Sequence, residues 1–266
     1  MKDEAESELN RLMRGVSSDH VETVRDAWRA VLAAGDSAVP LVRHRLQSDV
    51  WGSPPKGPVG KYLGVLLAVL HQLDAKVFGV EIERLQCERL HPIHAQTVKI
   101  MAGRRNEAPV AWVGPITEQV PVYVSKDLDD RRGIAEKIDH WCHTPGLDLR
   151  KVTRIDVIDH APGIDYLGCY DLFFSGIVMV WPGIRAGPRW LRRLAREHTF
   201  YHEVGHHACG HAEFGQVTEQ EREADAYAAK MMRVAHPVLI RVGRVIFWPL
   251  RGLARRSRLR RERLSE

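Results

Sequence analysis

Two short segments near the carboxyl end constrain the fold of this chain more than any other part of it. The first, residues 202–206, reads HEVGH and lies inside a helix that we predict over residues 189–209. On a helix, His202 and His206 lie one turn apart on the same face, so both imidazoles can bind one cation. Glu203 then lies beside them, where a carboxylate can take a proton from water that a metal ion activates. The segment predicts half of a zinc site with a general base next to it.

The second segment, residues 221–225, reads EREAD and lies on the next predicted helix. Glu221 and Asp225 are one turn apart, and they are in line with an apolar stripe formed by Ala224, Ala228, Met231 and Met232. Carboxylates on the apolar side of a helix need a cation or a hydrogen-bond donor. We therefore predict that Glu221 is the third metal ligand and that Asp225 accepts the outer N–H of His202. Glu223 is predicted to face solvent, without a role in the site.

Two alternatives compete with this assignment of the third ligand. Residues 218–221 read TEQE, which also spells a capping box in which Glu221 would only close the start of the helix. His211 is the other candidate ligand. In the metzincin pattern the third histidine follows the second by six residues with a glycine midway. Here Gly210 and His211 follow His206 by four and five residues, so the register differs by one.

Residues 199–211 (TFYHEVGHHACGH) and 221–232 (EREADAYAAKMM) together resemble the ImmA/IrrE family of gluzincin zinc metallopeptidases. The resemblance covers roughly residues 165–237. It implies a peptidase with zinc ligands at His202, His206 and Glu221 and a general base at Glu203. Two positions depart from the family pattern: Asp225 stands where the family usually has Asn, and His211 is one residue late for its HxxxH extension. The EAD spelling is closer to that of membrane-bound gluzincins.

Residues 20–103 predict consecutive helices with apolar side chains at 3.6-residue periodicity, over residues 21–34, 38–46, 61–73, 76–90 and 94–102. Residues 30–42 align with residues 68–80 at an offset of 38. This resembles a pair of HEAT-type helical hairpins, which would present a surface to a protein partner. An ordinary helical bundle that braces the rest of the chain is the alternative. A change of composition near residue 106 ends this predicted domain, residues 1–106.

Residues 107–250 form the second predicted domain, so the whole chain is expected to have an α+β fold. Strands are predicted at residues 120–125, 152–158, 166–170 and 176–181, with a helix at 130–142. Sheet first and metal-binding helix second is the order of a small zincin-like domain, a minigluzincin. By that resemblance, residues 176–181 would be the edge strand that pairs with an extended substrate through Ile177, Val178 and Met179. Candidates to stabilise an oxyanion are Tyr201, Tyr227 and His236.

Composition and charge indicate where the chain works and what its surface can contact. Its 44% apolar content is sufficient for real cores, and its four cysteines show no disulfide or CxxC spacing. The charged amino terminus lacks the apolar segment of a signal peptide, so a cytoplasmic protein is expected. The tail, residues 251–266, holds seven Arg and two Glu, and its net charge of +5 equals that of the whole chain. Such a tail can contact nucleic acid or an anionic membrane surface, or can simply be solvated.

These observations predict a zinc-dependent endopeptidase that hydrolyses peptide bonds of an intracellular protein substrate. The resemblance implies that this substrate is a regulator. The competing hypothesis is a binding protein without catalysis. In that case a metal ion would only tie two helices together, with His211 or another side chain in the position that water needs, and the helical repeat and the basic tail would carry the function.

Overall fold

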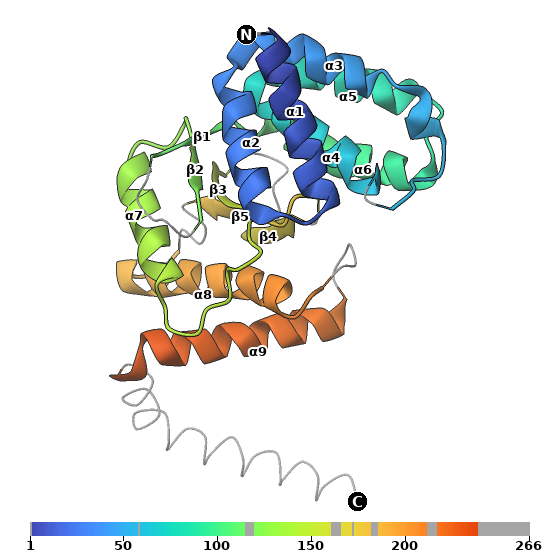
Figure 1. Ribbon diagram of the computed structural model, residues 1–266. Helices are drawn as coiled ribbons and strands as arrows, with labels where there is room; N and C mark the ends of the chain where they lie inside the picture. The colour runs from blue at the N-terminus through green and yellow to red at the C-terminus, as the bar shows by residue number, and fades with distance from the viewer. Residues whose placement is uncertain are drawn as a thin grey trace, which may run out of the picture.

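The computed structural model describes residues 2–57, 59–114, 120–160, 166–171, 173–181, 186–211 and 217–238. Over these residues the chain has an α+β fold, in which helices surround one five-stranded mixed sheet (Figure 1). The predicted segment from residue 239 onward, including the basic tail, lies outside the described residues. None of the helices that the structure describes combines the length and the apolar character needed to cross a membrane.

Six α-helices form a bundle at the amino-terminal end. They are α1 (Lys2–Ser17), α2 (Val21–Ala33), α3 (Val39–Leu46), α4 (Val59–Leu73), α5 (Ala75–Cys87) and α6 (Pro92–Ala102), with short 3-10 turns at η1 (Gly35–Ser37), η2 (Asp49–Gly52) and η3 (Gly103–Asn106). The five predicted helices are confirmed to within three residues at each end. Helix α1 was not predicted; in it one buried stripe (Ala5, Leu9, Leu12, Met13 and Val16) lies among many charged residues.

The sheet follows the bundle in the chain. Its strands are β1 (Val110–Trp112), β2 (Val122–Ser125), β3 (Arg154–Asp159), β4 (Gly168–Asp171) and β5 (Gly176–Trp181), and α7 (Arg131–Cys142) connects β2 with β3. Their spatial order is β1-β2-β3-β5-β4. The three inner strands run parallel to one another, whereas β1 and β4 pair antiparallel at the two edges. The four predicted strands are confirmed, and β1 was not predicted.

The prediction that residues 176–181 form the substrate-binding edge strand is wrong. Strand β5 pairs with β3 on one side and with β4 on the other, so Ile177, Val178 and Met179 lie inside the sheet. All six of its residues are buried. A continuous apolar run is typical of a strand covered on both faces. The edge next to β5 is instead β4, which is shorter and partly exposed.

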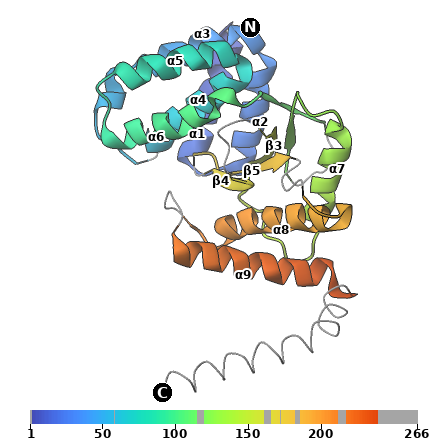
Figure 2. The same cartoon turned by 180° about the vertical axis from the view of Figure 1, so that it is seen from behind.

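Both faces of the sheet are covered by helices, in layers that Figures 1 and 2 show from opposite sides. On one face, Ile155, Ile177 and Met179 pack with α7 and with α8 (Arg189–Ala208), and α9 (Thr218–Ala235) lies outside α8. On the other face, Val178 and Val180 point toward the helical bundle. Alternate residues of β5 therefore serve two cores, as the period of a strand requires.

The bundle and the sheet also share a core. Phe173 and Phe174, from the β4–β5 connection, are buried among the side chains of the bundle. A Cβ atom on Gly64 would lie 2.4 Å from Cγ of Phe173, so only glycine lets this ring lie against α4. The Arg25 Nη2 atom of α2 donates to the carbonyl of Val152 at 2.6 Å. The predicted division at residue 106 falls at the end of η3, and side chains from both sides of it pack together.

Candidate metal centre

The HEVGH segment lies in the last two turns of α8, where the predicted ligand set comes together. The Nε2 atoms of His202 and His206 are 3.1 Å apart. From α9, the Glu221 carboxylate approaches both rings, with Oε2 at 3.2 Å from His202 Nε2 and Oε1 at 3.6 Å from His206 Nε2. The three side chains place one donor atom each within 4.8 Å of one another. Two imidazoles and a carboxylate are donors that Zn²⁺ takes in proteins.

A close contact between α8 and α9 holds Glu221 near the histidines. Gly205 lies between the two histidines in sequence, on the side of α8 that faces α9. A Cβ atom there would lie 3.0 Å from both Cα and O of Ala224 and 3.2 Å from Cβ of Tyr227. Because neither Gly205 nor Ala224 has a bulky side chain, the two backbones can approach. The glycine of the motif is thus needed for packing as well as for spacing.

Asp225 occupies the position that the sequence predicts. Its Oδ1 is 2.9 Å from His202 Nδ1, so the carboxylate orients the ring and leaves Nε2 toward the shared site. The capping-box alternative for Glu221 is not observed, because the N-cap of α9 is Val217 and Thr218 already belongs to the helix. The assumption that Glu221 and Asp225 are buried with the apolar side of α9 was wrong, because their side chains are 38% and 64% exposed. Both lie on the side of an outer helix that borders an open groove.

Glu203 is the most deeply buried acid of the site, with 5% of its surface exposed. It points at the edge strand β4, where a Cβ atom on Gly168 would be 2.9 Å from Glu203 Oε1. Burial, with a smaller contribution from the nearby Glu221 carboxylate, raises the pKa of Glu203 to about 8. A cation bound to the neighbouring histidines would oppose both effects. Glu203 therefore lies next to the three-donor cluster without belonging to it.

His211 and Glu223 make a pair of contacts behind His206 that the sequence did not predict. Gly210 has a φ of +71°, and its N–H donates to the carbonyl of His207, while the N–H of His211 donates to that of His206. This pair of bonds is the Schellman motif, which ends a helix and turns the chain back on itself. His211 is thereby placed behind His206, with its Nδ1 at 2.9 Å from His206 Nδ1.

Glu223 completes this second pair of contacts. Its Oε2 is 2.9 Å from Nε2 of His211, although half of the Glu223 side chain is exposed. Glu223 is thus exposed, as predicted, but its contact with His211 was not predicted. His211 is not the third ligand of the cluster with His202 and His206; instead it contacts the outer nitrogen of one of them. The glycine one residue before it was the sequence signal for this turn.

A groove of about 730 Å³ opens beside the three donors. Side chains of α8 and α9 line it together with β4 and the residues just before β4. Gln96 and Ile100 of α6 and Arg104 of η3 line it as well. Figure 2 shows α6 on the same side of the molecule as the end of α8 and the start of α9. The helical bundle thus contributes directly to the candidate site, which the sequence analysis did not foresee.

The three predicted oxyanion donors lie elsewhere, and none of them lines this groove. The Tyr201 hydroxyl contacts Thr144 Oγ1 at 2.6 Å and Glu197 Oε1 at 3.0 Å inside the core. The Tyr227 hydroxyl accepts from the Asp148 N–H, and His236 pairs with Glu197. Adjacent residues on a helix point about 100° apart, so Tyr201 cannot share the face of His202. These predictions are wrong.

Other polar side chains line the groove in their place. His198 lies one turn before His202 on α8, and burial lowers its pKa, which favours the neutral imidazole. Arg104 Nη2 donates to Asp171 Oδ2 at 2.6 Å, so this ion pair joins the bundle to the edge strand at the groove. The Tyr170 hydroxyl is 3.0 Å from His207 Nδ1.

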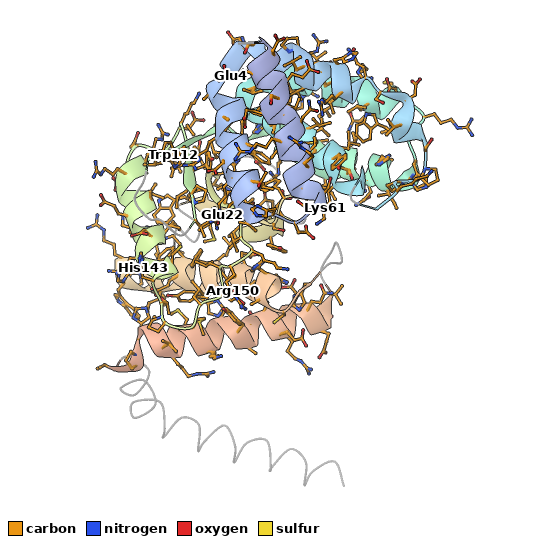
Figure 3. All side chains as sticks on the ribbon, in the orientation of Figure 1. Glu4, Glu22, Lys61, Trp112, His143 and Arg150 are labelled. Carbon is orange, nitrogen blue, oxygen red and sulfur yellow. The ribbon has the colours of Figure 1, made fainter. Side chains whose placement is uncertain are left out.

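A second cavity, of about 780 Å³ and mostly apolar, adjoins the groove. It lies between the bundle and the sheet, with Lys61 at its border; Figure 3 shows Lys61 at the end of the bundle that is nearer to α8. Gln96, Tyr170, Phe173 and His211 line both spaces, so the cavity begins where the groove ends.

The donor set fits a zinc ion on chemical grounds, because it combines neutral imidazoles with one carboxylate and faces an open groove. Burial lowers the pKa of His206, which also favours the neutral ring that binds metal. No family model, curated protein or solved structure matches this chain. The assignment of the site therefore depends on the chain's own residues and their geometry.

Proposed function

We propose that this protein is a zinc-dependent endopeptidase of the gluzincin type that cleaves an extended segment of a protein substrate. The observation that carries the proposal is the convergence of His202, His206 and Glu221 in a groove, with the buried Glu203 carboxylate next to them. Each ligand histidine also has a partner for its outer nitrogen. A merely accidental HExxH sequence would not require that arrangement.

A zinc ion at this site would supply Lewis acidity, which makes water a stronger acid and polarises a peptide carbonyl. The chain's own residues would do the rest. Glu203 takes a proton from the attacking water and gives it to the departing amine. Asp225 orients the His202 ring by its contact with Nδ1 of His202, and His211 orients the His206 ring by its contact with Nδ1 of His206. His198 and Tyr170 are the groove side chains that we propose as donors to the developing oxyanion.

Strand β4 replaces β5 as the proposed binding edge for the substrate. It pairs with β5 on one side only, and its residues Gly168–Asp171 line the groove beside the donor cluster. A peptide can add to such an edge through backbone hydrogen bonds, which hold an extended chain without requiring a particular sequence. Gly168 is the position on β4 that lies against Glu203. Pairing along β4 would therefore bring a peptide bond close to the general base.

The helical bundle would restrict which substrates enter. Gln96, Ile100 and Arg104 line the groove together with the three donors, so a substrate bound there would also contact the bundle. We propose that the bundle acts as a HEAT-like scaffold for a protein substrate inside the cell. That the substrate is a regulator follows only from the resemblance of the sequence motifs.

The first test compares metal content and cleavage in two variants. Glu221→Gln should lose most of the zinc, because the carboxylate that faces both histidines becomes a neutral amide. Glu219→Gln is the matched control, since Glu219 lies on the same helix and pairs only with Arg222 on the surface. Elemental analysis after purification gives the answer. Equal zinc in wild type and Glu221→Gln would remove Glu221 from the ligand set.

Glu203→Gln should keep zinc and thermal stability near those of wild type but abolish cleavage, because it removes proton transfer without removing a ligand. General base catalysis contributes about 10²- to 10⁴-fold, so the loss should be at least of this order. A broad library of unstructured peptides, followed by mass spectrometry of the products, serves as the assay. Cleavage by wild type and Glu203→Gln at equal rates would refute the mechanism. Zinc bound in wild type without any cleavage would favour a structural metal.

A further inference from the structure

A second cluster of metal-binding side chains lies directly behind the first. Cys209, His211 and Glu223 each place one donor atom within 4.8 Å of the others. They are a thiol, an imidazole and a carboxylate, and none of them belongs to the proposed peptidase ligand set. The cluster lies where α8 ends, with Cys209 as the C-cap residue of the helix and Glu223 approaching from α9.

The helix stop builds this cluster. Because Gly210 adopts a positive φ, the chain reverses after Cys209 and brings His211 back against the last turn of α8. On α9, Glu221 and Glu223 are two residues apart and approach different histidines. Cys209 and Glu223 are both exposed, so an ion can reach the cluster from solvent, whereas His211 is buried and fixed.

We propose that Cys209, His211 and Glu223 form a second Zn²⁺ site. Thiolate, imidazole and carboxylate are all ligands of zinc, and three protein ligands leave one position for solvent. Binding would release the thiol proton of Cys209 to solvent. At His211 the ligand atom is Nε2, because Nδ1 is already directed at His206. The proposal does not depend on whether the protein cleaves peptides.

The contact between His206 and His211 makes the two sites antagonistic. An ion bound at His206 Nε2 leaves the proton of that ring on Nδ1, which can be donated to His211 Nδ1 at 2.9 Å. His211 then carries its own proton on Nε2 and donates it to Glu223. A second ion at His211 Nε2 forces this proton onto Nδ1, where it faces the N–H of His206. Two donors would then point at each other, so each ion weakens the binding of the other.

Cobalt(II) can report on the second site alone. As a probe for zinc, Co²⁺ bound to a thiolate gives a sulfur-to-metal charge-transfer band in the near ultraviolet, and the first site contains no sulfur. Zinc-free full-length protein is titrated with Co²⁺ in oxygen-free buffer. We expect the band in wild type and in Cys87→Ser, which alters the other exposed cysteine, and its loss in Cys209→Ser. A missing band in wild type, or a band that persists in Cys209→Ser, would overturn the proposal.

The antagonism has its own readout in the same titration. His206→Ala removes the N–H that opposes His211, so the charge-transfer band should appear at a Co²⁺ concentration at least tenfold lower than in wild type. In Glu223→Gln the band should appear only at a Co²⁺ concentration at least tenfold higher than in wild type. Circular dichroism checks that each variant is folded. An unchanged midpoint in His206→Ala would refute the coupling, and neither result depends on peptide hydrolysis.

Discussion

The contact of Gly205 with α9 allows a quantitative test of how the site is assembled. In Gly205→Ala, the new Cβ would lie 3.0 Å from the backbone of Ala224, which cannot rotate away as a side chain can. Inserting a methyl group into a packed contact typically costs about 1–3 kcal/mol. Replacing glycine by alanine inside a helix returns roughly 0.5–1 kcal/mol. The two ranges together give a loss between zero and about 2.5 kcal/mol of unfolding free energy, with a central value of about 1 kcal/mol.

The same displacement should weaken the metal site. If α9 moves outward by a few tenths of an ångström, Glu221 recedes from both histidines, and we expect zinc affinity to fall at least tenfold. Chemical unfolding of metal-free protein measures the first effect, and competition with a chelating dye measures the second. Gly79→Ala is the matched control, because Gly79 is inside α5 and its Cβ would meet only Arg105 Nε at 3.6 Å. It should be neutral or slightly stabilising. Wild-type stability and affinity in Gly205→Ala would refute the reasoning.

Two further predictions concern activity and acid stability. Gly168→Ala should reduce cleavage at least tenfold in a peptide assay but retain zinc, because the new Cβ displaces Glu203 and touches no ligand. For His71, burial lowers the pKa from 6.5 in the unfolded chain to about 4 in the folded one. Between pH 6.5 and about pH 4 the unfolded state binds more protons than the folded state. About 3 kcal/mol of unfolding free energy should therefore be lost as the pH falls from 7 to 4. His71→Gln should flatten this decline in unfolding experiments at each pH; an unchanged slope would contradict it.

The grouping of the three donor side chains could be predicted because their spacing is local. His202 and His206 share a helical face whatever the rest of the fold does, and the same holds for Glu221 and Asp225 on α9. Only one tertiary assumption was needed, that these two faces meet. The apolar stripe of α9 supports it, since Ala224 and Ala228 are completely buried against the neighbouring elements.

Properties that depend on the order of strands could not be predicted in this way. The sequence of β5 shows that the strand is apolar, but its neighbours are decided by long-range pairing with β3 and β4. Its unbroken apolar run indicates only that both faces of the sheet are covered there, which the burial of all six residues confirms. The contribution of α6 and Arg104 to the groove is likewise tertiary, since about 70 residues separate Arg104 from its partner Asp171.

The case of His211 shows how a local rule can be applied too narrowly. Its spacing from His206 differs by one residue from the HxxxH and metzincin ligand patterns. The spacing has a different meaning once Gly210 ends the helix, because the residue after a C′ glycine returns to the carbonyl three positions before the C-cap. That geometry places His211 against His206 without making it a third ligand of the first cluster. The same turn leaves Cys209 at the helix end within reach of Glu223, so one glycine creates both the support of the first site and the second cluster.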